Sequence, residues 1–561
     1  MSTAEKHLLS KNELLKINDP TLGGTIGETL LNPDTDRFSE DDEQFLKFHG
    51  VYQQDDRDKR KTGKQYIFLI RARIPGGIVP PAQYLAFDKL SQLHGNDTLR
   101  ITSRQSFQWH GVVKKGLGPL MKGLNEVLCT TLAACGDVNR NVMAPPTPAT
   151  SPLVERVLED ARRVSEALLP QTRAYHEIWI NGAPLQLNTE EKQAFVDPLY
   201  GKQYLPRKFK VAFAIPPLND TDVFTNCLGF VAVADPTNPA RLLGYNVLVG
   251  GGQGMSHGNA ETYPRVADTL GFVAPEHLLD VAKAVLTTFR DFGDRANRKH
   301  ARLKYVLAER GVAWFRREVE HRMGFALSSA IVVSFQRQGD LFGWHRQSDG
   351  RWFLGLYVET GRIRDTAQRQ LKTALRRIVS THEPEIRLTP SQNLLLANVP
   401  AERKDAITAL LSEHGIPVEN QAAAVRRASM ACVSLPTCGL ALAESERALP
   451  GILDRLEALL AELNLVDEEI VVRITGCPNG CARPYMAELA FVGRAPGKYN
   501  VLLGGNVAST RLNREYRASV KTEDLINELR PVFTRWKNER LPGERLGDWV
   551  ARVLWKETPA A

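Results

Sequence analysis

Four of the seven cysteines in the chain lie in two close pairs near its C-terminal end. Five residues separate Cys432 from Cys438, three separate Cys477 from Cys481, and 38 lie between the pairs. Proline and glycine beside these cysteines bend the backbone, so the thiols can point inward from loops around one centre. Four thiolates suit a soft metal or an iron–sulfur cluster, whereas structural zinc favours pairs two to four residues apart, as in the second pair alone. The pattern predicts a four-cysteine metal centre rather than ordinary buried thiols.

The length and charge of the chain limit its class. Its 561 residues are enough for about three or four domains. No apolar run approaches the ~20 residues that span a bilayer, and the charged N-terminal segment has no secretory h-region. An odd, clustered set of cysteines argues against a disulfide framework and for a reducing cytoplasm, with Cys129, Cys135 and Cys227 as packing residues. The net charge of +8 favours an anionic partner: a nucleic acid, an acidic protein or an acidic cofactor.

Two segments of the chain recur in the same order. A strand, a turn, a helix and a second strand are expected over 65–135, and the pattern returns over 345–417, where Arg, Thr, Gln and Val residues match at a constant offset of 287 positions. A second match links the run that begins at Tyr245 to the run that begins at Tyr499. The sequence therefore predicts a duplicated two-part module.

The first copy carries a polar stripe that the second copy lacks. We expect one strand over 99–112, whose alternate side chains share a face. The residues on that face are Arg100, Thr102, Arg104, Ser106, Gln108 and His110. The second copy has Ser391, Leu395 and Ala397 at the positions that match Arg104, Gln108 and His110. We interpret the stripe as a ligand-binding face rather than a solvated one, and we expect one site that uses both halves.

Further polar positions precede or follow predicted strands. Lys208 and Lys210 share one face of an extended segment. A glycine run after an apolar strand could bring backbone N–H groups close to an anion; it comprises Gly250, Gly251 and Gly252. This run lacks the residues of a P-loop and the full spacing of a dinucleotide fingerprint, so on its own it is a weak signal.

These motifs together resemble a known family. The string Thr-Gly-Cys-Pro-Asn-Gly-Cys at 475–481, with the first cysteine pair upstream, resembles the sirohaem and [4Fe–4S] signature of nitrite and sulfite reductases. The runs at 52–58, 139–142, 205–210 and 248–252 are similar to those of the haemoprotein subunits of assimilatory sulfite reductases. The resemblance extends roughly from His49 to Trp549. It implies an α+β and α/β fold with a pseudo-twofold repeat: two ferredoxin-like half-domains joined into one lobe, and two α/β lobes that hold the cofactors.

The resemblance divides the chain into five parts. They are an N-terminal arm (1–64), a ferredoxin-like half-domain (65–135), a sirohaem-binding α/β domain (136–344), a second half-domain (345–417) and an iron–sulfur and sirohaem-binding α/β domain (418–561). We expect residues 1 to about 45 to form an arm or a loosely packed extension, because they are polar.

The resemblance also assigns roles to individual residues. It implies that the four paired cysteines bind the [4Fe–4S] cluster and that the Cys481 sulfur also bridges to the sirohaem iron. The anion-binding positions match Arg71 and Arg140 as a clamp and Lys208 and Lys210 as proton donors. The positions expected to contact the cofactors are Arg100, Arg104, Gln108, His110, Gly250, Gly251, Gly252 and Asn479.

The activity that the resemblance implies is the six-electron reduction of sulfite to hydrogen sulfide in sulfate assimilation and cysteine biosynthesis. The chain has no flavin or nicotinamide fingerprint, so we expect an NADPH-oxidising flavoprotein (alpha) subunit as electron donor. Ferredoxin is the alternative donor, because the run that begins at Cys481 is similar to that of ferredoxin-dependent relatives.

Two other functions compete with sulfite reduction. Nitrite reductases of this family tend to have Asn at the position of Lys210 and Ser or Thr at that of Gly480, so these two residues favour sulfite. A zinc-stapled nucleic-acid binder would also be basic, but it leaves the polar stripe and the duplication unexplained. We therefore expect neither a nucleic-acid partner nor a membrane partner, and a cytoplasmic location.

Overall fold

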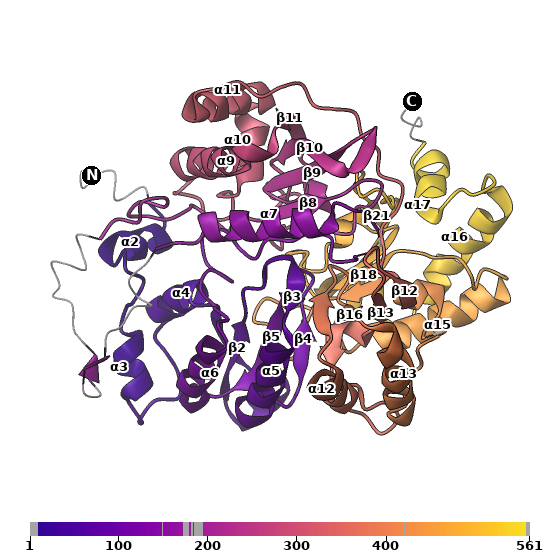
Figure 1. Cartoon of the computed structure of the whole chain (residues 1–561), viewed down its shortest axis with the longest axis horizontal. Coiled ribbons are helices and arrows are strands. Elements are labelled where there is room, and N and C mark those ends of the chain that lie inside the picture. The colour runs from indigo at the N-terminus through magenta and orange to yellow at the C-terminus, as the bar shows by residue number, and fades with distance from the viewer. Residues whose placement is uncertain are drawn as a thin grey trace.

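The structure is a computed structural model, and it describes residues 9–148, 150–171, 195–419 and 421–556, together with the backbone of 179–180 and 183–184. Figure 1 shows three groups of elements around a common centre. Strands β8–β11 with helices α9–α11 lie at the top, helices α5, α6, α12 and α13 at the bottom, and helices α15–α17 at the right. Within the described ranges, no helix is both long enough and apolar enough to cross a membrane.

The N-terminal region packs against the first α/β lobe, contrary to the predicted loose extension. Its described residues, from 9 onward, include the helices α2 (Lys11–Asn18), α3 (Ile26–Leu31) and α4 (Glu40–Phe48). Helix α4 begins after Ser39, whose hydroxyl accepts a hydrogen bond from the Asp42 N–H at 3.1 Å. Phe45 and Phe48 of this helix are buried with Leu22 in the core of the first α/β lobe. Two apolar residues are enough to anchor this polar helix, because their helical spacing places them on the same face.

The two ferredoxin-like half-domains form one lobe. The first contributes β1 (Val51–Asp55), β2 (Tyr66–Arg71), β3 (Ile78–Val79), α5 (Pro81–His94), β4 (Leu99–Ile101), β5 (Phe107–Val112) and α6 (Lys114–Glu126). The second contributes β12 (Gly343–Arg346), β13 (Trp352–Leu356), β14 (Arg362–Ile363), α12 (Leu371–His382), β15 (Glu385–Leu388), β16 (Leu394–Val399) and α13 (Lys404–Glu413). Each half-domain supplies an edge strand to the sheet of the other: β3 pairs with β15, and β14 pairs with β4. One continuous apolar core joins the halves, as the resemblance predicts.

Equivalent glutamines display the pseudo-twofold relationship. Gln105 Nε2 donates to the Leu388 carbonyl oxygen at 3.0 Å, and Gln392 Nε2 donates to the Ile101 carbonyl oxygen at 3.3 Å. Both contacts cross between the half-domains, and both pairs of equivalent residues are 287 positions apart. The predicted duplication is therefore confirmed.

The predicted continuous strand over 99–112 is wrong. The chain instead forms a hairpin of β4 and β5, with a turn in which Gln105 has φ +52°. The second copy turns in the same way at Gln392, with φ +70°. Neither turn contains glycine, and the first also lacks proline, so the usual turn signals are weak or absent. The hairpin register pairs Arg100 with Gln108, so these two side chains still share a face of the sheet.

Each α/β lobe contains a mixed sheet covered by helices. The first sheet has the order β11–β10–β9–β8, built from β8 (Val211–Ala214), β9 (Leu228–Asp235), β10 (Asn238–Val249) and β11 (Asp268–Val273). Its helices are α7 (Val154–Ala167), α9 (Leu278–Phe292), α10 (Leu303–Arg310) and α11 (Val312–Met323). The second sheet runs from β17 to β21 in order, built from β17 (Ser429–Ala431), β18 (Val472–Thr475), β19 (Leu489–Ala495), β20 (Lys498–Leu503) and β21 (Arg514–Lys521). Its helices are α14 (Ala424–Arg427), α15 (Leu449–Glu462), α16 (Leu525–Glu539) and α17 (Leu546–Trp549).

Candidate functional site

The four paired cysteines lie on two loops at one edge of the second α/β sheet. Strands β17 and β18 are parallel neighbours, so the loops that leave their carboxyl ends lie side by side. Cys432 directly follows β17 and Cys477 closely follows β18, while Cys438 and Cys481 lie farther along the same loops. The Gly476 N–H donates to the Cys432 sulfur at 3.4 Å and so joins the two loops.

The thiols influence one another electrostatically. Burial raises the pKa of Cys477 to about 12, with a further contribution from the nearby Cys481. Burial and Cys481 also raise the pKa values of Cys432 and Cys438. In the part of the chain that the structure describes, no three His, Cys, Asp or Glu side chains are arranged to hold a single metal ion. The effect of Cys481 on the other three thiols indicates that all four lie near one another, and four thiolates fit an iron–sulfur cluster.

Arg71, at the end of β2, contacts several polar side chains. Its Nη1 donates to the Cys135 sulfur at 3.3 Å, and its guanidinium carbon lies 5.8 Å from the centre of the Tyr52 ring. With the Gln108 amide turned so that its oxygen faces Arg71, that oxygen accepts from Arg71 Nε at 2.9 Å. The same amide lies 3.4 Å from His110 Nε2, and burial holds the pKa of His110 well below its usual range. Burial and the neighbouring arginines thus disfavour the charged form of His110.

Lys208 connects the first α/β lobe to the cysteine loops through Asn479. Lys208 Nζ lies 3.5 Å from Asn479 Oδ1, and Asn479 Nδ2 lies 3.6 Å from the Cys481 sulfur. Burial, followed by the charge of neighbouring cations, lowers the pKa values of Lys208 and Lys210 well below the usual range. Arg140 is one of the cations that act on Lys208. The predicted anion-binding residues of this lobe therefore share one electrostatic environment.

Several arginines lie close enough to act on Lys208 and Lys210. The cations that act on these lysines are Arg104, Arg140, Arg207 and Arg302. Several buried polar atoms also lack a hydrogen-bond partner among the described residues: Arg104 Nε, both side-chain polar atoms of Asn139, Gln253 Nε2 and Arg302 Nε. Buried polar groups without partners are costly, and four of these five atoms carry N–H donors, so they suit a ligand with several acceptors. A macrocycle that bears carboxylates, together with a small oxyanion, fits these residues.

The two arginines of the predicted stripe have different surroundings. Arg100 is buried; its Nη1 lies 2.7 Å from Glu446 Oε2, its Nη2 donates to the Ala431 carbonyl at 2.8 Å, and its Nε donates to another carbonyl. All three nitrogens bind protein groups, so Arg100 anchors β17. Its contact with the cofactor, which the resemblance implies, stays a prediction. Arg104 keeps Nε without a partner, and burial followed by neighbouring arginines lowers its pKa to about 9. Arg104 therefore remains a candidate ligand contact.

The glycine run does not present free N–H groups to an anion, so that prediction is wrong. The N–H groups of Gly250, Gly251 and Gly252 donate to the carbonyl oxygens of Cys227, Asn226 and Arg265, at 3.0, 2.9 and 2.8 Å, respectively. Glycine is required for packing instead. A Cβ added to Gly251 would lie 2.1 Å from the Phe224 carbonyl oxygen.

Arg483, which the sequence did not indicate as a site residue, lies where the lobes meet. Its Nε lies 2.5 Å from Asp222 in the first α/β lobe. Its other nitrogens donate to the Ser103 and Pro390 carbonyls, one in the hairpin turn of each half-domain, at 2.7 and 2.9 Å. Arg473 of β18 shares Asp222 at 2.7 Å. The position of Arg483, two residues after the last cysteine, is the one sequence signal that could have indicated its role.

The fold places four thiols on two adjoining loops near a group of buried cations, an arrangement that suits an iron–sulfur redox protein. The nitrite and sulphite reductase 4Fe-4S domain matches residues 159–327 and 422–558, and the nitrite/sulfite reductase ferredoxin-like half domain matches residues 59–127 and 345–414. The chain belongs to this nitrite and sulphite reductase family.

Related proteins match this chain over nearly its whole length. The sulfite reductase [NADPH] hemoprotein beta-component of Myxococcus xanthus is 49% identical, with 98% of each chain covered. The protein of the same name from Staphylococcus haemolyticus is 46% identical, over 96% of this chain and 94% of the relative. The Mycobacterium tuberculosis NirA structure has a TM-score of 0.78 at 24% identity, with 97% of this chain and 96% of that chain covered, and so supports the fold.

Proposed function

We propose that this chain is the haemoprotein component of an NADPH-dependent sulfite reductase, which carries out the six-electron reduction of sulfite to sulfide. The observation that carries this proposal is the Lys208–Asn479–Cys481 connection, which joins a buried cationic residue to one of the four clustered cysteines. The names of the full-length relatives support the same activity. A cytoplasmic, assimilatory role agrees with the clustered cysteines.

The proposed cofactors are sirohaem and a [4Fe–4S] cluster. Cys432, Cys438, Cys477 and Cys481 would ligate the cluster, with Cys481 shared with the sirohaem iron. Once bound, these groups supply electrons one at a time and an iron site for the substrate sulfur. Gln108 and His110 line the space beside Arg71, and Arg104 offers its unpartnered N–H to a carboxylate of the macrocycle.

Four basic residues would bind the substrate and deliver protons. Arg71 and Arg140 act as the clamp, because a guanidinium stays charged and matches two oxyanion oxygens at once. Lys208 and Lys210 act as proton donors, because an ammonium whose pKa is lowered releases its proton more readily to an oxygen that leaves as water. Sulfite binding adds negative charge beside both lysines and so favours their protonated form.

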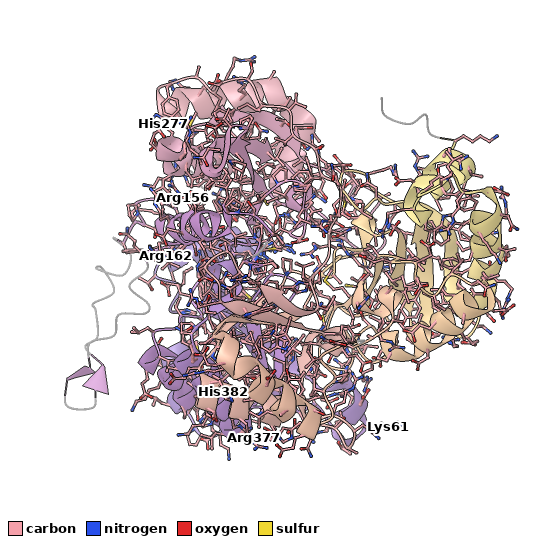
Figure 2. All side chains as sticks on the ribbon, turned by 45° about the vertical axis from the view of Figure 1, so that its right-hand side comes forward. Lys61, Arg156, Arg162, His277, Arg377 and His382 are labelled. Carbon is pink, nitrogen blue, oxygen red and sulfur yellow. The ribbon has the colours of Figure 1, made fainter. Side chains whose placement is uncertain are left out.

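The proposed electron donor is an acidic domain of a flavoprotein subunit. A basic segment, Arg57–Thr62, covers the first cysteine loop, and Arg57 donates to the Ala441 and Gly439 carbonyls at 2.8 and 2.7 Å. Leu440 between them is 66% exposed, and Lys61 lies at the outer surface in Figure 2. Positive charge thus lies around an exposed apolar side chain, next to the proposed cluster ligands. Such a surface suits a partner with negative charge around its redox centre.

The test is sulfide production by the purified, sirohaem-loaded protein with two donors in parallel. One reaction contains NADPH and a flavoprotein subunit, and the other contains chemically reduced ferredoxin. Turnover with the flavoprotein supports the NADPH enzyme, and turnover with ferredoxin alone would replace the donor but keep the activity. A loaded protein that makes no sulfide with either donor would contradict the proposal.

A further inference from the structure

Two backbone segments hold the proposed substrate-binding residues of the first α/β lobe. Residues 137–140 end in Arg140, and residues 205–210 contain Lys208 and Lys210. Three backbone hydrogen bonds join the segments: Leu205 N to Asp137 O at 3.0 Å, Phe209 N to Val138 O at 3.0 Å, and Arg140 N to Phe209 O at 2.9 Å. The spacing between the arginine and the lysines therefore depends on this pairing.

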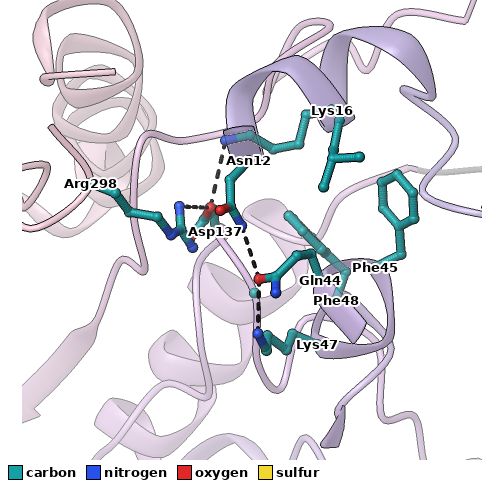
Figure 3. Close-up of a pocket in the computed structure, with 10 residues that line it drawn as sticks. Asn12, Lys16, Gln44, Phe45, Lys47, Phe48, Asp137 and Arg298 are labelled. Atoms are coloured by element: carbon teal, nitrogen blue, oxygen red, sulfur yellow. Dashed lines mark hydrogen bonds and ion pairs between the residues drawn. The ribbon is translucent and has the colours of Figure 1, made fainter. Parts of the chain in front are cut away.

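Helix α2 inserts a lysine behind both segments. Lys16 Nζ donates to the Leu205 carbonyl at 2.8 Å and lies 3.6 Å from Asp137 Oδ2, so one ammonium touches each segment. It also donates to Glu13 Oε1 at 2.5 Å. Lys16 is 2% exposed, and Figure 3 shows that it and Arg298 both lie beside Asp137. A lysine this deeply buried requires such partners, because an unpaired buried charge is strongly unfavourable.

Other residues already satisfy the charges of the two carboxylates. Arg298 binds Asp137 through two nitrogens, at 2.8 and 3.1 Å. Arg295 forms an ion pair with Glu13 and donates to the Tyr204 carbonyl at 2.8 Å. If Lys16 were absent, each carboxylate would still have an arginine. The particular contribution of Lys16 is therefore the bridge between the two segments.

We propose that Lys16 is a positioning residue for the anion site: from helix α2 it holds residues 137–140 against residues 205–210 and so sets the distance between Arg140 and Lys208. This inference rests on the proposed function, which gives these residues their substrate. Small displacements of positioned groups weaken binding and catalysis strongly. Helix α2 would thus act on the anion site through the backbone segments that it holds.

The test compares Lys16→Met with Lys11→Met in the full-length holoprotein. Lys11 lies on the same helix, but its side chain is 67% exposed and pairs with Asp41 at 2.8 Å. Hydrogen exchange is measured on peptides that contain the Arg140 and Phe209 amides. We expect exchange about tenfold faster in Lys16→Met, unchanged exchange in Lys11→Met and partial recovery in Lys16→Arg. Wild-type exchange in Lys16→Met would overturn the proposal whatever the activity.

A second measurement connects the positioning to the anion. Sulfite affinity is measured from the visible absorption of the oxidised holoprotein, and the KM for sulfite from turnover. We expect both to weaken about tenfold in Lys16→Met, with a smaller change in kcat. Faster exchange with unchanged affinity would overturn the positioning role, whereas a wild-type protein that binds no sulfite would instead reject the proposed function. If Lys16→Met fails to fold, Glu13→Leu/Lys16→Met, which removes the buried pair together, takes its place.

Discussion

Lys208 Nζ lies 3.5 Å from the side-chain oxygen of Asn479, although the two residues belong to different α/β lobes. The amide nitrogen of Asn479 is in turn 3.6 Å from the Cys481 sulfur. The proposed proton donor and a proposed cluster ligand are thus joined through one side chain. A change of the Lys208 charge should therefore alter the electrostatic environment of Cys481 as well as that of the substrate.

Lys208→Met should lower kcat/KM for sulfite by about 10²-fold, the usual cost of removing one charged donor from a transition state. Iron and sirohaem content should stay at the wild-type level, because the ligating cysteines are unchanged. Lys202→Met is the matched control, since Lys202 is exposed on the same stretch of chain. Steady-state kinetics check the prediction, and a change within twofold would remove Lys208 from the mechanism.

Lys210→Asn should shift the preference of the enzyme from sulfite toward nitrite. Sulfite carries more charge and more oxygen atoms than nitrite, so it loses more when the second ammonium is replaced by a neutral amide. The quantity to measure is the ratio of kcat/KM for the two substrates. An unchanged ratio would show that Lys210 does not discriminate between them.

Cys438→Ser should give a protein that lacks a complete cluster, because a serine oxygen is a poor replacement for a soft thiolate ligand. Iron and acid-labile sulfide should fall well below the wild-type content. Cys129→Ser, a change of a buried cysteine outside the two loops, should retain both. Wild-type iron content in Cys438→Ser would mean that the four-cysteine assignment is wrong.

Asp220→Asn should stabilise the protein at alkaline pH. Burial, with a contribution from Asp340, raises the pKa of Asp220 to about 8, whereas in the unfolded chain it is about 3.9. The folded protein therefore favours the protonated form: its full stability is present below about pH 4 and is lost as the pH rises toward about 8. Asparagine has no such titration, so calorimetry should show a Tm gain near pH 8 that disappears near pH 4. Asp467→Asn, at an exposed position, should show no such pH dependence, and an equal gain at both pH values would refute the explanation.

Leu440→Asp should slow electron transfer from a protein donor and leave activity with a small chemical reductant unchanged. The substitution places a negative charge on the proposed docking surface beside Arg57, where an acidic partner would be repelled. Turnover with the flavoprotein and with dithionite-reduced methyl viologen separates the two steps. Equal loss with both reductants would show damage to the cluster rather than to docking.

The sequence was most informative where chemistry fixes residue type and spacing. The two cysteine pairs indicated a cluster because thiols at such intervals have few other uses, and the offset of 287 revealed the duplication because matched residues such as Gln105 and Gln392 make equivalent contacts. The break at Gln105 was invisible, since a left-handed φ at a glutamine has no local signature. In that conformation the Gln105 side chain donates to the carbonyls of Gly76, Ala144 and Leu388, which lie far from it in the sequence.

Contacts between distant segments account for the other errors. The polar N-terminus gave no sign that Lys16 enters a buried ion network, because its partner Asp137 is more than a hundred residues away. Arg483 and Asp222 likewise meet across lobes. The glycine run could be read as an anion loop because its sequence does not reveal that the Cys227, Asn226 and Arg265 carbonyls already occupy its N–H groups.

The exchange of edge strands between the half-domains affects how the chain folds during its synthesis. Residues 78–79 complete the sheet of the second half-domain, and residues 362–363 complete the sheet of the first. When only the N-terminal half has left the ribosome, the sheet of the first half-domain therefore still has an open edge. That edge is a template for pairing with another nascent chain. The same geometry, in two separate half-length polypeptides, would be a strand-exchanged dimer. The single chain turns that association into an intramolecular step, whose rate no longer depends on concentration.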